Sequence, residues 1–156
     1  MTGAAGPEGA GAGAHTLRLP GGYEISDARD RLDMGLVADV LAGSYWARGR
    51  PPALTLRSWA NSLCLGLYAP EGRQIGGARI LTDRALRAHL ADVFVLPETR
   101  GRGLGRALVE AALAHPDLAT VTRWTLTTAD AHGLYAGFGF RVAPHDEGWM
   151  VLERGA

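Results

Sequence analysis

Arginine and glycine alternate in one short stretch of the chain, Arg100-Gly-Arg-Gly-Leu-Gly-Arg106. An apolar, β-branched and aromatic run at 92–96 precedes this stretch and is typical of a buried strand. The run at 106–115 is rich in alanine and leucine, and one helical face would carry Leu104, Leu108, Ala111 and Ala112. A glycine-rich turn between a strand and a helix offers backbone N–H groups to an anion. The pattern therefore predicts a site for a phosphate-bearing ligand.

The composition limits the partners of this site. The chain has 156 residues, enough for one domain with a proper core and short for two. Sixteen basic and 16 acidic residues give a net charge of +0, which favours a small anionic ligand over nucleic acid or an anionic membrane. Cys64 is the only cysteine, which excludes an intramolecular disulfide and a cysteine metal cluster and fits a reducing cytoplasm. We expect no membrane span and no secretory signal.

The remaining sequence predicts the elements that position the turn. A first strand is expected from two short pieces, 17–19 and 23–25, around the turn 20–22. Further strands are expected at 63–68, 74–81, 86–95, 121–127, 140–142 and 149–153. Helices are expected at 30–42, 52–61, 106–115 and 129–138, the last weakened by Gly133 and Gly137. The order β-αα-βββ-α-β-α-ββ indicates an α/β (α+β) fold, a mixed sheet with helices on its faces. A Gly/Ala-rich tail at 1–14, with nothing to bury, precedes one domain at 15–156.

Two motifs resemble a known family. Arg100-Gly-Arg-Gly-Leu-Gly105 fits the R/Q-x-x-G-x-G/A motif of the GCN5-related N-acetyltransferases (GNAT family). Some 30 residues later, Ala131-His-Gly-Leu-Tyr-Ala-Gly-Phe-Gly-Phe140 resembles that family's A-x-x-L-Y-x-x-x-G-F motif. The expected element order also agrees, so the resemblance covers nearly the whole chain apart from the tail. It implies a mixed, mostly antiparallel sheet of six to seven strands with about four helices. The Rossmann and Walker A patterns, by contrast, are absent.

The resemblance implies acetyl-coenzyme A as the co-substrate, and no metal. Its pyrophosphate would lie on the N–H groups of 101–105 at the positive end of the helix, while its pantetheine arm would pair with backbone at Phe94 and Val95. Many family members have Asn where this chain has Thr128, a residue that either hydrogen-bonds through its hydroxyl or caps the following helix. The expected cofactor-binding residues are Phe94, Val95, Arg100, Gly101, Arg102, Gly103, Leu104, Gly105, Arg106 and Thr128.

Acetyl transfer needs a proton donor for the departing thiolate, and the resemblance assigns this role to Tyr135; the alternative is a tyrosine that packs on the sheet. The base is His89, Asp92 or a water relay. His89 has an unperturbed pKa of about 6.5 and would share a face with Ala91 and Val93. Asp92 would point to the opposite face of a regular strand. There it would orient a substrate ammonium or form a structural salt bridge to Arg79 or Arg123.

The acceptor pocket of this fold is usually shaped by the first two helices and the loop between them. Tyr45 and Trp46 lie in that loop and either stack on an apolar or cationic acceptor or, for Trp46 in particular, cover the core. The side chains expected in the core are those of Trp59, Trp124, Trp149 and Cys64.

The first functional hypothesis is an N-acetyltransferase that transfers acetyl from acetyl-coenzyme A to a primary amine, on a small molecule or a protein, by direct attack in a ternary complex. The alternative is a non-catalytic acyl-coenzyme A sensor of the same fold. A nucleic-acid protein that uses the three arginines is disfavoured by the zero net charge. The expected partners are acetyl-coenzyme A and an amine, with no nucleic acid and no membrane. Apolar edge strands would suit a homodimer.

Overall fold

In the computed structural model, which describes residues 13–143 and 148–154, a six-stranded sheet has the order β1-β2-β3-β4-β5-β6. Successive strands from β1 to β5 pair antiparallel, and β6 pairs parallel with β5. The strands are β1 Thr16–Arg18, β2 Glu24–Ser26, β3 Leu63–Tyr68, β4 Gln74–Thr82, β5 Arg87–Val95 and β6 Arg123–Thr125. The mixed, mostly antiparallel sheet expected from the sequence is thereby confirmed.

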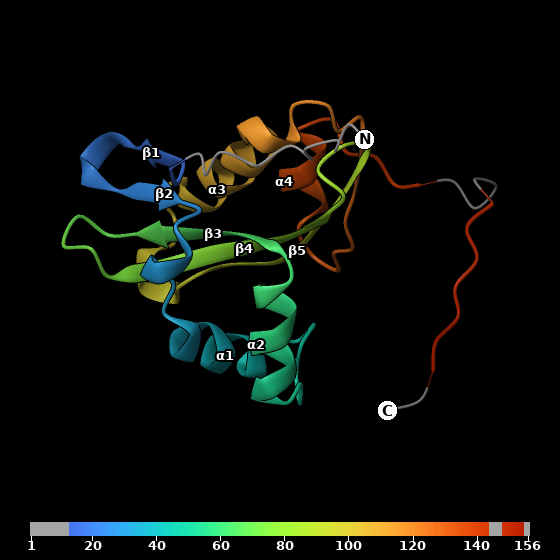
Figure 1. The fold of residues 1–156 in the computed structure, drawn as a ribbon, viewed down its shortest axis with the longest axis horizontal. Coiled ribbons are helices and arrows are strands. Elements are labelled where there is room, and N and C mark those ends of the chain that lie inside the picture. The colour runs from blue at the N-terminus through green and yellow to red at the C-terminus, as the bar shows by residue number, and fades with distance from the viewer. Residues whose placement is uncertain (1–12, 144–147, 155–156) are drawn as a thin grey trace, which may run out of the picture. The chain divides into compact units, whose positions relative to one another are not determined.

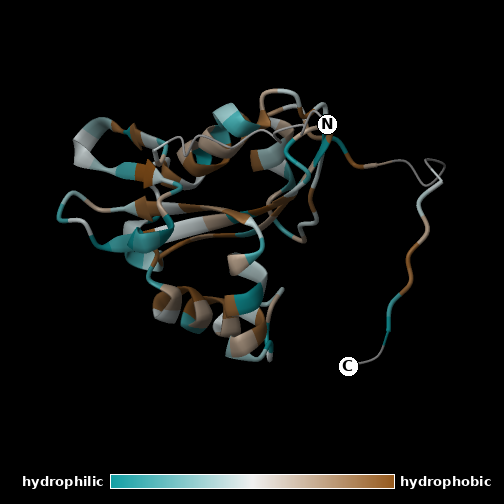
Figure 2. Ribbon diagram, in the orientation of Figure 1, coloured by the Kyte–Doolittle hydropathy of each residue, from teal (hydrophilic) through white to brown (hydrophobic). Residues whose placement is uncertain are grey.

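Helices cover both faces of this sheet. They are α1 Met34–Gly43, α2 Pro52–Ala60 and α3 Leu104–Leu113, and a further helix, α4 His132–Ala136, follows β6 in the chain. α1 and α2 lie on one side of the central strands and α3 lies on the other (Figure 1). β3 is buried along its whole length, as expected of a strand that is covered on both faces. Apolar residues are concentrated on β3 and α1, whereas the β3–β4 turn is hydrophilic (Figure 2).

The N-terminal region differs from the expectation of one strand. A 3-10 turn at Pro20–Gly22 separates β1 from β2, and the two strands form an antiparallel hairpin. Gly21 and Gly22 have φ values of 81° and 84°, which glycine adopts at little cost. The alternating pattern on either side of this turn was therefore that of two strands. Of the tail expected at 1–14, residues 1–12 lie outside the described residues.

The first helix begins later than expected. Arg29–Arg31 form a separate 3-10 turn, and α1 begins at Met34. The side chain of Asp33 accepts a hydrogen bond of 3.0 Å from the N–H of Leu36 and so caps the helix. The expected start at 30 was wrong because Leu32 continues the apolar spacing across this cap, and spacing alone does not reveal where a helix is interrupted.

The chain falls into two compact units, Met1–Leu126 and Thr127–Ala156. The second contains α4, which has 5 residues and is shorter than the expected helix at 129–138. No strand occurs at 140–143 or 148–154, so the expected closing pair of strands was wrong in the described part of the chain. Trp149 is 57% exposed and is not a core residue. Strands this short depend on a paired neighbour, which a local apolar pattern cannot guarantee.

Among the described residues, no helix combines the length and the apolar character needed to cross a bilayer.

Candidate functional site

The glycine-rich turn opens α3 two residues earlier than expected. The helix begins at Leu104, and its first intrahelical hydrogen bond runs from the N–H of Ala107 to the carbonyl of Gly103, at 3.0 Å. The N–H groups before Ala107 therefore lie outside the helical ladder. Gly103 is the N-cap residue and has no side chain that could occupy them. The backbone of the turn therefore has the geometry that an anion site, expected here from the sequence, would need.

Two glycines of this turn are in the left-handed conformation. The φ value is 77° at Gly101 and 74° at Gly103, a region that side-chain-bearing residues rarely adopt. A Cβ atom at either position would meet nothing within 4 Å. The space in front of the turn is thus open, and the glycines are required by the backbone conformation rather than by crowding. Gly105 differs, because it is helical and a Cβ there would lie 3.7 Å from Cγ2 of Val95.

Arginines flank the turn and bind neighbouring groups. Nε of Arg100 donates to the carbonyl of Val95 at 3.1 Å, and Nη1 of Arg102 donates to the hydroxyl of Tyr23 at 2.6 Å. Arg106 lies exposed in the first turn of α3. Because a guanidinium has five N–H donors, Arg100 and Arg102 retain further donors for an anion. The turn therefore combines backbone N–H groups with three positive charges.

The edge of β5 beside this turn is open. β6 pairs only with Arg87–His89, and beyond His89 no described strand covers this edge. The N–H of Leu96 donates to the carbonyl of Ile75 at 2.8 Å, which makes these residues a hydrogen-bonded pair. Antiparallel pairs alternate, so the backbone groups of Val95 face the open edge and those of Phe94 face β4. An extended ligand that pairs with this edge would meet Val95.

β5 contains a bulge at Asp92. Phe94 pairs with Gly77 and Ala91 pairs with Arg79, so two residues of β5 lie opposite one residue of β4. Asp92 has a φ value of 50°, a left-handed conformation that Asp tolerates better than most residues. The strand is therefore not regular at Asp92. The bulge brings the Asp92 carboxylate onto the face of Ala91 and Arg79, the face it would not reach in a regular strand.

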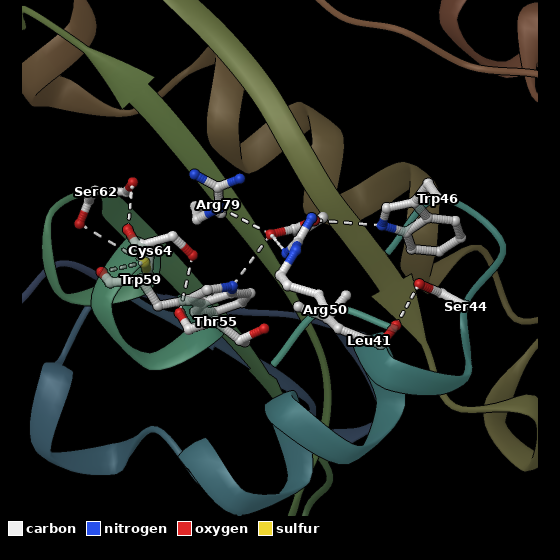
Figure 3. A network of polar contacts seen from close by, with 11 residues as sticks. Leu41, Ser44, Trp46, Arg50, Thr55, Trp59, Ser62, Cys64 and Arg79 are labelled. Carbon is white, nitrogen blue, oxygen red and sulfur yellow. Dashed lines mark hydrogen bonds and ion pairs between the residues drawn. The ribbon is translucent and has the colours of Figure 1, made fainter. Parts of the chain in front are cut away.

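The carboxylate of Asp92 is the centre of a buried polar cluster, and its side chain is 2% exposed. Four side chains from β4, α2 and the α1–α2 loop bind this carboxylate, and Figure 3 labels these four residues. The donors are Arg79 Nε at 2.8 Å, Arg50 Nη1 at 3.1 Å and Nη2 at 3.4 Å, and the Nε1 atoms of Trp46 and Trp59 at 3.3 Å each. Both carboxylate oxygens are thereby satisfied, as a buried charge requires.

The sequence identified only part of this cluster. A lone carboxylate in an apolar strand predicted a partner, and Arg79 was one of the two arginines expected. Arg50 and Trp46 were not connected with Asp92, because each lies more than 40 residues from it. Trp59 was expected only as a core residue. It is buried, but its indole N–H also binds the carboxylate.

The cluster determines the protonation of Asp92. Burial by itself would raise the pKa of this carboxyl group, but the hydrogen bonds and charges of Arg79 and Arg50 together lower the pKa below its ordinary value. Asp92 is therefore a carboxylate at neutral pH. The side chains that donate to the carboxylate stabilise its ionised form. Because its pKa is lowered, Asp92 is a poor proton acceptor.

His89 lies at the end of the β5–β6 pairing and is half-buried. Its Nδ1 shares a hydrogen bond of 2.8 Å with Oγ1 of Thr125. Desolvation, with the charge of Arg79 as a second cause, lowers the pKa of His89 below 6.5. The imidazole is therefore neutral at physiological pH, the form in which a histidine can accept a proton.

Tyr45 and Trp46 lie together in the α1–α2 loop. Their rings meet edge to face, with centroids 5.0 Å apart and an interplanar angle of 83°. Tyr45 is 53% exposed and Trp46 is 43% exposed, so neither residue simply covers the core. The pair offers an aromatic surface next to the Asp92 cluster, to which Trp46 is bonded.

In the second unit, Tyr135 is a buried residue of α4, and its ring meets that of Phe140 edge to face at 5.9 Å. Oγ1 of Thr128 accepts a hydrogen bond of 3.1 Å from the N–H of Ala131. This bond closes the turn before α4, but the N-cap residue of α4 is Ala131 and no side chain caps the helix, so the expectation that Thr128 caps it was wrong. The roles expected for both residues at the cofactor stay predictions.

Comparisons with known proteins agree on one family. A family model described as "Acetyltransferase (GNAT) domain" matches residues 61–142, just over half of the 156 residues. A solved structure of a candidate GNAT-family acetyltransferase from Xanthomonas campestris pv. campestris is 44% identical, with a TM-score of 0.79 over 86% of this chain and 93% of that chain.

Two further proteins are similar to this chain. A candidate acetyltransferase from Gibberella zeae is 29% identical over 98 residues, which make up 52% of this chain and 54% of that protein. This chain therefore spans about half the length of that curated relative. A Mycobacterium tuberculosis protein solved with CoA and a second ligand has a TM-score of 0.61 at 22% identity, over 77% of this chain and 72% of that chain. At this identity the similarity shows the fold alone.

Proposed function

Because this chain belongs to the GNAT acetyltransferase family, we propose that it is an N-acetyltransferase that transfers the acetyl group of acetyl-coenzyme A to a primary amine. The observation that carries the proposal is the turn 101–105. It combines two left-handed glycines, a helix N-terminus without a capping side chain, and open space in front of both glycines. These features suit a pyrophosphate, which needs close approach to several N–H groups.

Different residues around the turn would bind different parts of the co-substrate. The N–H groups from Gly101 to Arg106 and the side chains of Arg100 and Arg102 would hold the phosphates. The open edge of β5 at Val95 would pair with the extended arm. Nε of Arg100 occupies the Val95 carbonyl in this structure, so an arm that pairs there would displace that contact. Leu104 is buried and anchors the first turn of α3 in the core.

The chemistry requires two proton transfers. The amine nitrogen forms a bond to the thioester carbonyl carbon and loses a proton to a base, which is either His89, through Nε2, or a water molecule. The carbon–sulfur bond then breaks, its electron pair stays on sulfur, and Tyr135 donates its phenolic proton to the thiolate. Solvent returns a proton to Tyr135. Neutral His89 has the protonation state that the first transfer needs.

The test combines turnover with binding. Mixing the protein and acetyl-coenzyme A with a panel of primary amines should release free thiol in the presence of at least one amine. Tyr135→Phe should reduce kcat while leaving the Kd for coenzyme A, measured by calorimetry, within about twofold, because the hydroxyl acts only on the departing thiolate. Unchanged kcat would remove Tyr135 from the mechanism. Tight coenzyme A binding without acetylation of any amine would instead favour the non-catalytic acyl-coenzyme A sensor.

A further inference from the structure

The α1–α2 loop, residues 44–51, has no helix or strand of its own. Two of its side chains, Trp46 and Arg50, reach back to the sheet, and both bind the same carboxylate. Through these two bonds Asp92 joins the loop to β5. The bulge is what makes the connection, since a regular strand would direct Asp92 to the other face of the sheet.

The carboxylate restrains Trp46 in particular. The indole donates its one N–H to Oδ1 of Asp92, yet 43% of the residue remains exposed. Tyr45 packs edge to face against it and is still more exposed. The hydrogen bond restricts the rotamers of Trp46, and the ring contact restricts those of Tyr45. Such a pair binds a ligand at a lower entropic cost than two free side chains would.

The charges of the cluster restrict the ligand. Arg79 and Arg50 bring two positive charges to the single negative charge of Asp92, so the cluster carries an excess of one positive charge. A second cationic group on the acceptor would be repelled there. A planar or apolar group would instead bury surface against the rings of Tyr45 and Trp46.

We propose that Asp92 is a positioning residue for the acceptor: it holds the Tyr45–Trp46 pair beside the β5 bulge, where the pair binds a planar or apolar group next to the reacting amine. The inference rests on the proposed acetyltransferase function. Asp92 transfers no proton in this scheme, because its carboxylate is already bound by four side chains. Asp92 affects the reaction by holding Trp46 in place.

Two tryptophans allow a matched test. Trp46→Phe and Trp59→Phe each remove one indole N–H from the same carboxylate, and both N–H groups lie 3.3 Å from an oxygen of Asp92. Only Trp46 belongs to the loop. We expect Trp46→Phe to raise the hydrogen-exchange rate of residues 44–51 about tenfold, because the loop loses a charge-assisted bond, and Trp59→Phe to leave that rate within about twofold. This readout needs no turnover.

The kinetic readout uses 2-phenylethylamine as a planar acceptor and 1,4-diaminobutane as a dicationic one. We expect the wild type to prefer 2-phenylethylamine. Trp46→Phe should raise KM for that amine about tenfold, with kcat changed less than about threefold and coenzyme A affinity unchanged. Asp92→Asn should raise KM in the same way, and the double variant with Trp46→Phe should add less than the sum of the single effects, because both changes break the same contact.

Each result has a defined meaning. Unchanged loop exchange in Trp46→Phe, equal KM effects of Trp46→Phe and Trp59→Phe, or a preference for the dicationic amine would overturn the positioning role. A loss of kcat in Asp92→Asn at unchanged KM would make Asp92 part of the proton transfer instead. If the wild type acetylates no amine at all, the proposed function fails and the acceptor role fails with it, whereas the exchange measurement still decides whether Asp92 anchors the loop.

Discussion

Replacing Gly103 with alanine should weaken coenzyme A binding more than it weakens the fold. The residue has φ 74° and ψ 10°, and a Cβ atom there would meet no other atom within 4 Å. The folded protein therefore suffers no clash. Its only cost is the left-handed conformation of an L-residue, about 1 kcal/mol. The methyl group would project into the open space where the phosphates are proposed to bind.

The expected loss of affinity follows from that position. An anion that is kept away from even one N–H group of the helix terminus loses a charge-assisted hydrogen bond, worth about 1.5–3 kcal/mol. This corresponds to a rise in Kd of roughly tenfold to a hundredfold. Unfolding in urea should show a loss of only about 1 kcal/mol, so the two measurements separate the binding effect from the effect on the fold.

Gly105→Ala is the matched control, two residues away. Gly105 is helical, and a Cβ there would make an ordinary contact with Val95 at 3.7 Å. Alanine should stabilise the helix by about 0.5–1 kcal/mol and change Kd by less than about twofold. Calorimetric titration of the three proteins with coenzyme A provides the comparison. Wild-type affinity in Gly103→Ala, or a larger loss in Gly105→Ala, would refute the proposal that the turn 101–105 binds the phosphates.

Three further measurements test other parts of the structure. Tyr68→Phe should raise the free energy of unfolding by about 1 kcal/mol, because the Tyr68 hydroxyl is buried without a partner among the described residues; a loss of stability would show that the hydroxyl is bonded. The lowered pKa of Asp92 means that its stabilising effect is present above the unfolded value of about 3.9 and disappears as the pH falls through the folded pKa. Urea midpoints should therefore decline more steeply below pH 4 in the wild type than in Asp92→Asn, and parallel curves would contradict this. If His89 is the base, kcat/KM should rise with pH through a pKa below 6.5, and this limb should vanish in His89→Gln; its persistence would assign the base to water.

Local signals predicted the parts of the site that depend on local backbone. A glycine-rich turn that opens a helix was expected here, and the helix that follows Gly101 and Gly103 begins within two residues of the expected start. Such features arise from contacts between neighbours in the chain, so residue types and spacing are sufficient to predict them. The same holds for the central strands, where long apolar runs leave few alternatives.

The ends of the chain were predicted less well, because a strand depends on a partner that a local pattern does not reveal. The expected strands at 140–142 and 149–153 are absent from the described residues, although their patterns resemble those of the strands that did form. A strand is stabilised by the strand beside it, so a short apolar pattern without a partner remains without regular structure. The turn at 20–22 was expected, but the apolar alternation on both sides of it did not reveal that it separates two strands that pair as a hairpin.

The sequence by itself determined the glycine-rich turn that opens α3, the order of the central elements and the resemblance to the acetyltransferases, because each of these is encoded in a contiguous stretch. Only the tertiary structure decided the surroundings of Asp92. The bulge that turns its side chain arises from the pairing of β5 with β4, and Arg50 and Trp59 reach it from 42 and 33 residues away. A carboxylate whose surroundings come from distant segments has no local signature, so its partners and its lowered pKa become visible only once the chain has folded.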